Sequence, residues 1–480
     1  MSWSTERSRR LLLASIAIYV AHAFVHREAL FVDAAIPAAM ADNLASGLGF
    51  AAYPGAAWVE GFTSPLWVLL LTPAALLGLP TTVAAQLLGV ALGAGGLALS
   101  WQLARRMVPD PRAALAAPLF LACSTTWVTW SVSGMEYVPF GTLLLAAITR
   151  LIVERDEPTR KPLSALLLGL LVLARPEGLV FALALGASWV FTVRGRGRLI
   201  RLVLLSAPLL IWQAVRVAGF GEGAGVAVHL SLERLQLSGS AGWRYLAEFS
   251  DEGRLLLLAA VIAGAFLGRG QGLLRRLLIT GVLVGAAWAW LVQGDWAQGH
   301  RLLVPVVAVA APLLAAGLSG ALRLRRGGRV AFALLLLGVL GVELADSDHH
   351  RYATSVAEVR LRIAHIQAHA DSIGLEDIAV ADVDVGPFYL DTDWPVVDCS
   401  GRFDVALAQE YTEAAVARRV LEEARPTYVH VHGGWASKSG LLKHPDWDAT
   451  YVEIPGYEMA NGHTHVGTYV RRELLPDGGR

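Results

Sequence analysis

The chain carries charged side chains at the borders of its hydrophobic runs, where an enzyme at a membrane surface would need them. These residues are Asp33, Glu60, Glu136, Arg175, Glu177, Asp295 and Arg301. A carboxylate in such a place can accept the proton of a hydroxyl group, and a guanidinium group binds phosphate through fork-shaped, charge-assisted hydrogen bonds. Charge is costly where water meets hydrocarbon, so its accumulation there indicates function. The residue types favour general-base chemistry beside a bound phosphate.

Most of these residues also have an ordinary structural explanation. Arg175 and Glu177 can flank a solvated turn between two helices, and Glu136 can cap a helix because acids favour helix N-termini. Asp295 can be a solvated loop acid, and Asp33 lies at a helix end, where acids are common. Structural and functional interpretations of these positions therefore stay open at the level of sequence.

The segment Phe31–Trp67, which connects two apolar runs, is the most informative loop of the chain. It lies between two apolar runs, is too long for a tight turn, and contains Asp33, Asp42 and Glu60 but no Lys or Arg. Glu60, in the apolar sequence VEGFTSPLW, is the hardest of the acids to explain by structure alone. The absence of basic residues predicts that this loop faces away from the cytoplasm.

Composition predicts a helical membrane protein that crosses the bilayer many times. Of 480 residues, 55% are hydrophobic and 17% charged, and the mean hydropathy is +0.50; a soluble chain has about 25% charged residues. The zero net charge favours no nucleic-acid partner. Two cysteines and scattered His pairs, including His430 and His432, have no strong metal-ligand spacing, so no metal site is predicted. The apolar runs lie near 11–31, 64–79, 82–104, 113–131, 138–153, 163–176, 178–193, 200–218, 254–268, 274–292, 302–320 and 330–345.

Arginine clusters between alternate runs predict the topology. Basic residues favour the cytoplasmic side, which places the N-terminus inside and the C-terminal tail outside. Two apolar runs separate the outer Asp33 from the inner Arg105, although parity permits only one crossing there. We therefore expect about eleven crossings plus one re-entrant or interfacial helix within 64–104, in a bacterial inner membrane.

The tail has a different composition and predicts a small α/β domain. Residues 354–371 have helical periodicity, 377–383, 395–398, 427–432 and 464–470 are typical of short strands, and a helix is expected near 404–424. The expected division is a membrane domain over 1–345 and an extracytoplasmic domain over 346–480. The second unit is large enough for a core of its own.

Taken in order, five segments resemble a known family. They are VD at 32–33, YPGAAWVEGFTSPLW, SGMEYVPF, LARPEGLVF and GDWAQGHRLLVP. The series is similar to the GT-C glycosyltransferases, integral membrane enzymes that take a sugar from a polyprenyl-phosphate carrier. Within them it most resembles the bacterial group that includes the mycobacterial terminal arabinofuranosyltransferases. In the tail, VVDCSGRFD is similar to the family's viDxxGL segment.

The resemblance implies a GT-C-like helical bundle and roles for the charged residues. Asp33 would be the general base that deprotonates an acceptor hydroxyl. Glycosyl transfer also needs positive charge on the departing phosphate, which Arg175 and Arg301 would supply. The remaining predicted contacts would orient these arginines, bind sugar hydroxyls, stack on sugar faces or anchor the chain at the interface; they are Glu60, Glu136, Glu177, Asp295, Tyr53 and Trp58.

The sequence departs from the family pattern at two places. An acidic pair is expected where Val32–Asp33 stands, so either one acid suffices or the chain is a weak or inactive relative. The family's PNT segment is not evident within Gly219–Gly253, which indicates a different acceptor. No cofactor is firmly predicted, and a divalent cation stays open because members of the superfamily differ in using one.

The sequence thus predicts a membrane enzyme that moves a sugar from a polyprenyl-phosphate donor to an envelope glycan, lipid or protein. The sugar would be arabinofuranose or another pentose or hexose. Two alternatives remain: a non-catalytic scaffold, for which Val32 is the main support, and a transporter or lipid flippase. Charge gathered at one face rather than within the helices disfavours the transporter.

Overall fold

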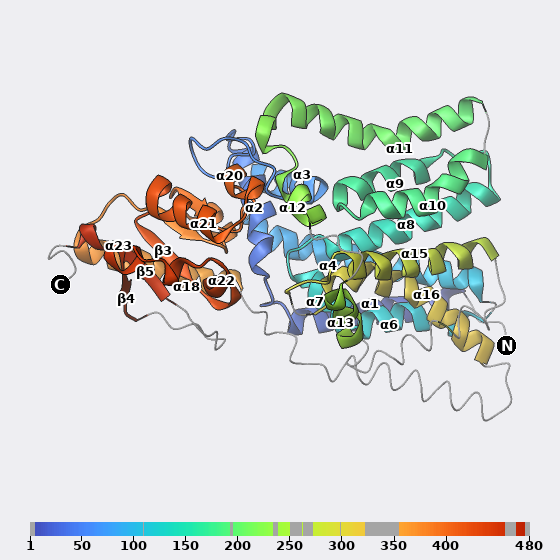
Figure 1. Ribbon diagram of the computed structural model, residues 1–480. Coiled ribbons are helices and arrows are strands. Elements are labelled where there is room, and N and C mark those ends of the chain that lie inside the picture. The colour runs from blue at the N-terminus through green and yellow to red at the C-terminus, as the bar shows by residue number, and fades with distance from the viewer. Residues whose placement is uncertain are drawn as a thin grey trace.

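The computed structural model shows a long bundle of helices with a small α/β unit at one end (Figure 1). The structure describes residues 5–108, 110–192, 195–233, 239–249, 262, 272–297, 299–321, 355–456 and 467–475. The expected domain border at 345/346, the apolar run 330–345 and all but one residue of the run 254–268 lie outside these ranges.

Helices and short helical turns account for the bundle. The helices are α1 (Thr5–Val25), α2 (Ala35–Ala45), α3 (Pro65–Leu76), α4 (Thr81–Met107), α5 (Pro111–Ala114), α6 (Ala116–Cys123), α7 (Thr125–Val132), α8 (Tyr137–Asp156), α9 (Leu163–Ala174), α10 (Gly178–Thr192), α11 (Arg196–Val215), α12 (Val226–Glu233), α13 (Ser240–Phe249), α15 (Gly272–Leu291) and α16 (Val304–Ala321). The short turns are η1 (Val32–Ala34), η2 (Arg216–Phe220), η3 (Gly221–Gly223) and η5 (Arg301–Leu303).

Six helices in the described part of the chain are long and apolar enough to cross a membrane: α1, α4, α8, α11, α15 and α16. A seventh span arises if α5–α6 and α7, which meet at a 52° bend, are counted together. The predicted polytopic helical bundle is confirmed, whereas the number of about eleven crossings stays a prediction.

The apolar run 64–79 forms the short helix α3. Its 12 residues extend about 18 Å at 1.5 Å per residue, well short of the roughly 30 Å of hydrocarbon. Pro65 occupies its first turn, where the missing N–H costs no hydrogen bond. Among the two helices within 64–104, α3 has the length suited to the expected re-entrant or interfacial role.

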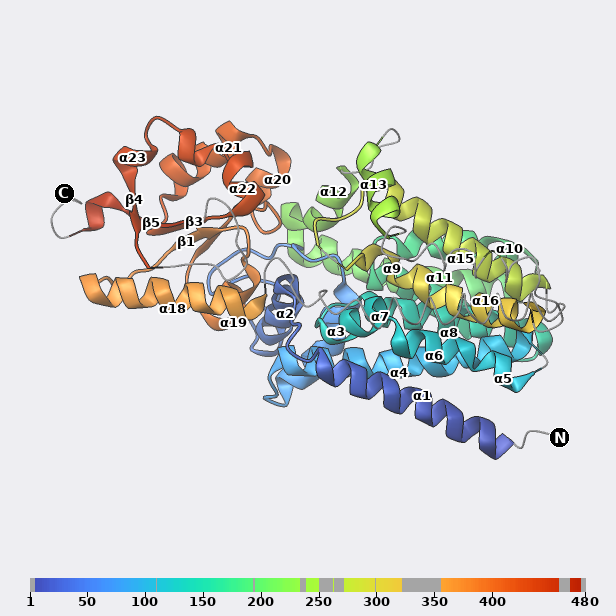
Figure 2. The same ribbon diagram turned by 90° about the horizontal axis from the view of Figure 1, so that it is seen from below.

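The C-terminal α/β unit, residues 355–475, is a sheet covered by helices on both faces. Its strands are β1 (Val380–Asp382), β2 (Val396–Asp398), β3 (Tyr428–Val431), β4 (Tyr451–Ile454) and β5 (Gly467–Arg471), in the order β2-β1-β3-β5-β4. Its helices are α18 (Val356–Ile373), α19 (Gly386–Asp391), α20 (Val405–Gln409), α21 (Glu413–Ala417), α22 (Gly433–Lys438) and α23 (Trp447–Thr450), followed along the chain by the short turn η9 (Arg472–Leu474). Figure 2 shows α18 on one face and α21, α22 and α23 on the other.

The α/β unit largely follows the expected pattern. The predicted helix 354–371 corresponds to α18, and the four predicted strands correspond to β1, β2, β3 and β5. The single helix expected near 404–424 is instead divided into α20, α21 and a π-helical turn at Arg418–Ala424. Strand β4 was not predicted, because its sequence YVEI is short and begins directly after α23.

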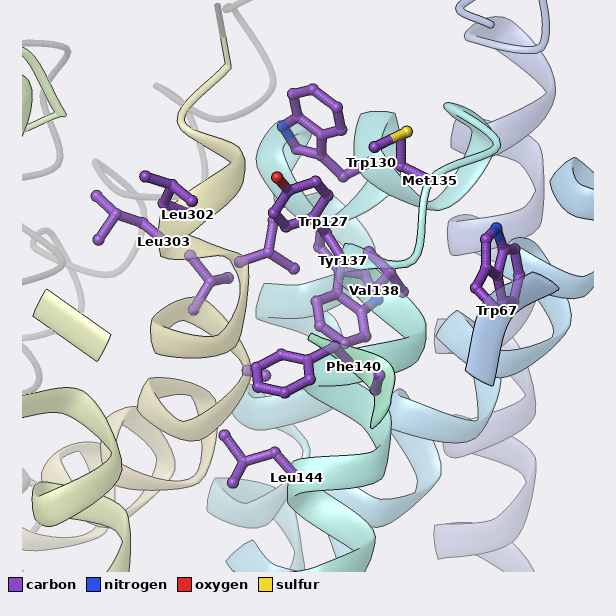
Figure 3. Packing of buried hydrophobic residues seen from close by; sticks show 14 of the residues in the cluster. Trp67, Trp127, Trp130, Met135, Tyr137, Val138, Phe140, Leu144, Leu302 and Leu303 are labelled. Atoms are coloured by element: carbon purple, nitrogen blue, oxygen red, sulfur yellow. The ribbon is translucent and has the colours of Figure 1, made fainter. Parts of the chain in front are cut away.

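Aromatic packing fixes the end of the bundle that faces the α/β unit. The rings of Trp130 and Tyr137 lie 5.5 Å apart between centroids, and both side chains are buried. In Figure 3, Leu302 and Leu303 face the aromatic side chains of α7 and α8. This packing holds the turn that follows α15 against the start of α8.

The α/β unit is joined to the bundle beside η1. The amide of Val356 donates to the carbonyl of Leu30, at 3.3 Å. A Cβ added to Gly386, at the start of α19, would lie 3.0 Å from the Cβ of Ala35 in α2, so the two helices approach closely. The residues around Asp33 therefore lie at the junction of the two parts.

Candidate active site

A cavity of about 710 Å³ lies between the end of the bundle and the α/β unit. Its charged lining from the bundle comprises Asp33, Glu136, Arg175, Glu177, Asp295 and Arg301, and Tyr137 lies among them. Its lining from the α/β unit includes Asp384, Ser400, Arg402, Tyr411, His432, Trp435 and Lys438. The structure thus brings together six of the charged residues selected from the sequence, and adds a second set from the tail.

Asp33 lies in η1 and faces two guanidinium groups. Its Oδ2 accepts a hydrogen bond from Arg301 at 3.2 Å, and its Oδ1 accepts one from Arg402 at 3.0 Å. Burial alone would raise the pKa of this carboxyl, but the charges of Arg402 and Arg301 together hold it below its ordinary value. Asp33 is therefore ionised, and both of its oxygens are engaged by arginine.

Arg301 is held between acids and aromatic rings. It pairs with Asp295 through Nε and through Nη2, the latter at 3.1 Å from Oδ1, and its guanidinium carbon lies 5.0 Å from the ring centroid of Phe31. The preceding residue, His300, has φ +51°, and the indole of Trp130 donates to the Gly299 carbonyl at 2.7 Å. These contacts fix the turn and aim the guanidinium at Asp33.

Arg175 forms a separate buried cluster in the same cavity. Its Nη1 pairs with Glu136 and its Nε pairs with Glu177. The guanidinium carbon stacks 3.9 Å from the ring centroid of Tyr137, the first residue of α8. Two carboxylates and an aromatic face therefore surround this arginine.

Glu60 lies apart from the cavity lining. Its carboxylate accepts hydrogen bonds from the indole of Trp212 at 2.7 Å, from Arg216 at 2.7 and 2.9 Å, and from the amide of Gly225 at 2.6 Å. The side chain is fully buried. These contacts tie the loop after α2 to the end of α11. In the described residues, Glu60 therefore has a structural role.

Tyr53 and Trp58 also lie outside the cavity lining. Trp58 is about a third exposed, donates to the Leu48 carbonyl at 3.1 Å, and stacks edge-on against Phe50 with centroids 5.6 Å apart. Tyr53 is half-buried against the hydrophobic core. Neither ring is placed where a sugar in this cavity would meet it.

Among the lining residues that sequence reasoning missed, Arg402 is the one that contacts Asp33. It follows β2 in the segment DCSGRF, which the sequence singled out only as similar to a family motif. Nothing in that segment showed that it would reach the first loop of the bundle, more than three hundred residues away. The one available signal was an arginine directly after a glycine in a segment with a family resemblance.

Asp382, Asp384 and His432 form a buried triad in the α/β unit, with ligand atoms within 4.8 Å of one another, so it could hold a divalent cation. The Nε2 of His432 lies 3.1 Å from Asp384. The guanidinium of Arg362 already lies 2.5 Å from Asp382 and 3.5 Å from Asp384. Burial alone would raise the pKa of Asp384, but His432 and Arg362 lower it. A cation would have to displace Arg362, so the fit is incomplete.

The strand order of the sheet places two members of this triad at the cavity. Strands β1 and β3 are parallel neighbours, and the chain leaves β1 for β2 on the opposite side. Such a reversal of strand order opens a crevice at the carboxyl ends of the strands, where α/β proteins bind ligands. Asp384 and His432 follow those ends, and both line the cavity.

Comparison with solved structures identifies the fold. The chain is similar to the oligosaccharyltransferase of Archaeoglobus fulgidus in its apo form, with a TM-score of 0.61 and 14% identity over 96% of this chain and 75% of that one. It is also similar to ArnT from Cupriavidus metallidurans bound to undecaprenyl phosphate, with a TM-score of 0.59 and 13% identity over 96% and 98% of the two chains. A second structure of the Archaeoglobus enzyme, in complex with Zn and sulfate, matches with a TM-score of 0.56 and 14% identity over 97% and 74%.

No model of a known protein family matches the chain, and no curated protein matches it. The fold and the helices together define the chain as a membrane protein with the GT-C fold.

Proposed function

We propose that the chain is a membrane glycosyltransferase that moves a sugar from a polyprenyl-phosphate donor to a hydroxyl-bearing acceptor. The observation that carries this proposal is the meeting of Asp33 with arginine side chains in one cavity at the end of a GT-C bundle. The volume of about 710 Å³ falls within the range of small-molecule sites. The similar fold of ArnT, solved with undecaprenyl phosphate, supports a lipid-phosphate donor.

The proposed reaction assigns the acceptor proton to Asp33. As the bond between the anomeric carbon and the phosphate oxygen breaks, the acceptor oxygen forms the new glycosidic bond and its proton passes to the carboxylate. The phosphate leaves with the lipid and keeps the bonding electron pair. Arginine stabilises this developing charge, and the burial of the cavity strengthens each electrostatic contact.

The two sides of the cavity suit different substrates. We place the donor at the helix ends, where Arg301 and Arg175 lie, because an isoprenoid chain must remain in the membrane. We place the acceptor against the α/β unit, where Asp384 can accept hydroxyl hydrogen bonds and Trp435 offers an aromatic face. An envelope glycan, lipid or protein would reach this side from the extracytoplasmic space.

The division into a catalytic unit over 1–345 and an extracytoplasmic unit over 346–480 is part of this proposal. So are an N-terminus in the cytoplasm, a bacterial inner membrane, and arabinofuranose or another pentose or hexose as the sugar. The chemistry assigned to Asp33 needs no bound cation, since guanidinium groups already neutralise the carboxylate. A divalent cation at Asp382, Asp384 and His432 would have to displace Arg362, so no step of the proposed reaction is assigned to one.

The test is sugar transfer by the purified protein in lipid nanodiscs, with a polyprenyl-phosphate-linked sugar and an envelope glycan acceptor. Asp33→Asn should lower turnover by at least about a hundredfold, because it removes the general base. Asp391→Asn is the matched control. Asp391 pairs with Arg360 at 2.7 Å, and neither residue lines the cavity. Full turnover by Asp33→Asn would overturn the base assignment, and no transfer by the wild-type protein with any such donor would overturn the function.

A further inference from the structure

The three arginines that line the cavity differ in how far their charge is already used. Arg175 contacts two glutamates, and Arg301 contacts Asp295 and Asp33. Among the described residues, Arg402 contacts a single carboxylate, that of Asp33. Its side chain is 27% exposed, against 8% for Arg175 and 7% for Arg301. Of the three cavity arginines, Arg402 therefore has the fewest carboxylate contacts and the most exposed side chain.

The loop that carries Arg402 is built to hold it in place. Asp398, at the end of β2, accepts hydrogen bonds from the amide and hydroxyl of Ser400, at 2.8 and 2.6 Å, and from the amide of Phe403 at 2.8 Å. Gly401 has φ +79°, a conformation that other residues rarely adopt. The loop is thus closed around one carboxylate, with Arg402 at its tip.

Contact with the bundle then aims the loop at Asp33. The ring of Phe403 lies against Gly61, where a Cβ would come within 2.4 Å of it. The same ring packs edge-on against Tyr389 of α19, with centroids 5.1 Å apart. The neighbouring Arg402 consequently reaches across the junction and donates to Asp33.

We propose that Arg402 binds the phosphate of the donor, and that Asp33 occupies its guanidinium until the donor arrives. A carboxylate and a phosphate oxygen offer an arginine the same kind of charge-assisted acceptor. When the phosphate takes over Arg402, Asp33 keeps Arg301 and loses one of its two cations. The carboxylate then becomes a stronger base at the moment when the donor is in place.

This inference rests on the proposed function and assigns part of the donor site to the α/β unit. The bundle supplies Arg175 and Arg301, each already in contact with two carboxylates, and the α/β unit adds Arg402, which contacts one. The exchange also links donor binding to the basicity of Asp33. An acceptor hydroxyl is therefore not deprotonated before the donor is bound.

The test is a double-mutant cycle on the affinity for undecaprenyl phosphate, the kind of lipid that would remain after transfer. The affinity is measured by fluorescence or calorimetry on the full-length protein in detergent. Arg402→Gln should weaken binding by about tenfold to a hundredfold, the loss expected for hydrogen bonds to a charged group. Arg402→Lys should be intermediate, because it keeps the charge without the fork. Arg360→Gln, which removes an arginine of the same unit outside the cavity, should bind as the wild type does.

The direction in which Asp33→Asn changes the affinity for undecaprenyl phosphate distinguishes the proposed exchange of Arg402 between Asp33 and phosphate from a purely structural ion pair. Asp33→Asn should tighten binding of undecaprenyl phosphate, since it frees Arg402, even though it abolishes transfer. In the Arg402→Gln background, Asp33→Asn should raise the affinity only slightly. The two substitutions are then non-additive, which shows that Asp33 and Arg402 are coupled. Equal tightening in both backgrounds, or unchanged binding by Arg402→Gln and Arg402→Lys, would overturn the inference while leaving the transferase proposal intact. A wild-type protein that binds no undecaprenyl phosphate and transfers no sugar would remove both.

Discussion

The contact between Gly61 and Phe403 should make turnover unusually sensitive to a single methyl group. An alanine Cβ at position 61 would lie 2.4, 2.5 and 2.6 Å from three carbons of the Phe403 ring. Ordinary contacts begin near 3.4 Å, so the ring must retreat by about 1 Å. Because Arg402 precedes Phe403, the guanidinium should move with it.

The expected size of the effect follows from that displacement. The hydrogen bond from Arg402 to Asp33 is 3.0 Å long, and a shift of about 1 Å would take it beyond hydrogen-bonding distance. Overpacking at one site costs about 1–3 kcal/mol of folding free energy, whereas a misplacement of about 1 Å at a reacting group can cost roughly a hundredfold in rate. Gly61→Ala should therefore reduce sugar transfer by about tenfold to a hundredfold while the protein still inserts and folds.

Transfer in nanodiscs and thermal unfolding in detergent measure the two quantities separately. Gly272→Ala is the control, because a Cβ there meets no atom within 4 Å. Adding Phe403→Leu to Gly61→Ala should restore part of the activity, since the smaller side chain vacates the space of the ring. Wild-type turnover in Gly61→Ala, or a loss that Phe403→Leu does not relieve, would show that this contact does not position Arg402.

Three further outcomes follow from buried charge. Arg175→Gln should destabilise the protein by about 3–5 kcal/mol, seen as a lower unfolding temperature, because two buried glutamates lose their common cation; an unchanged unfolding temperature would contradict this. Glu60→Gln should have a similar cost yet leave the affinity for undecaprenyl phosphate unchanged in the folded fraction. Burial, and then the charge of Arg362, hold the pKa of His430 well below its ordinary value of about 6.5. Below that pH the unfolded chain takes up a proton that the folded state refuses. Stability should therefore fall by up to about 1.4 kcal/mol per pH unit, and His430→Asn should flatten the pH dependence of the unfolding temperature.

The sequence predicted the elements well because apolar periodicity and arginine clusters act over short distances. The runs at 82–104, 138–153 and 302–320 became α4, α8 and α16, with boundaries shifted by a few residues. Asp33 and Arg301 could be selected because they border such runs and belong to segments with a family resemblance. Their meeting, at 3.2 Å, depends on contacts between distant parts of the chain.

The sequence could not assign partners to these charges. Glu60 had a functional interpretation because an acid in an apolar loop is costly, yet its cost is met by Trp212, Arg216 and the Gly225 amide. Arg402 had only a weak local signal, its place in a segment with a family resemblance, because its contact with Asp33 forms only where the sheet meets the bundle. Local pattern therefore selected charged residues at the ends of apolar runs without distinguishing those that line the cavity from those that hold the fold.

The structure explains why position 32 carries valine rather than a second acid. Val32 is 1% exposed and belongs to the hydrophobic core, and it does not line the cavity. A carboxylate in that orientation would be buried among apolar side chains, where an unpaired charge is strongly destabilising. Asp33 is instead supported by cations, from Arg301 on the bundle and Arg402 on the α/β unit. In the proposed mechanism, one acid between two guanidinium groups can serve as the base, so Val32 is weak support for a non-catalytic scaffold.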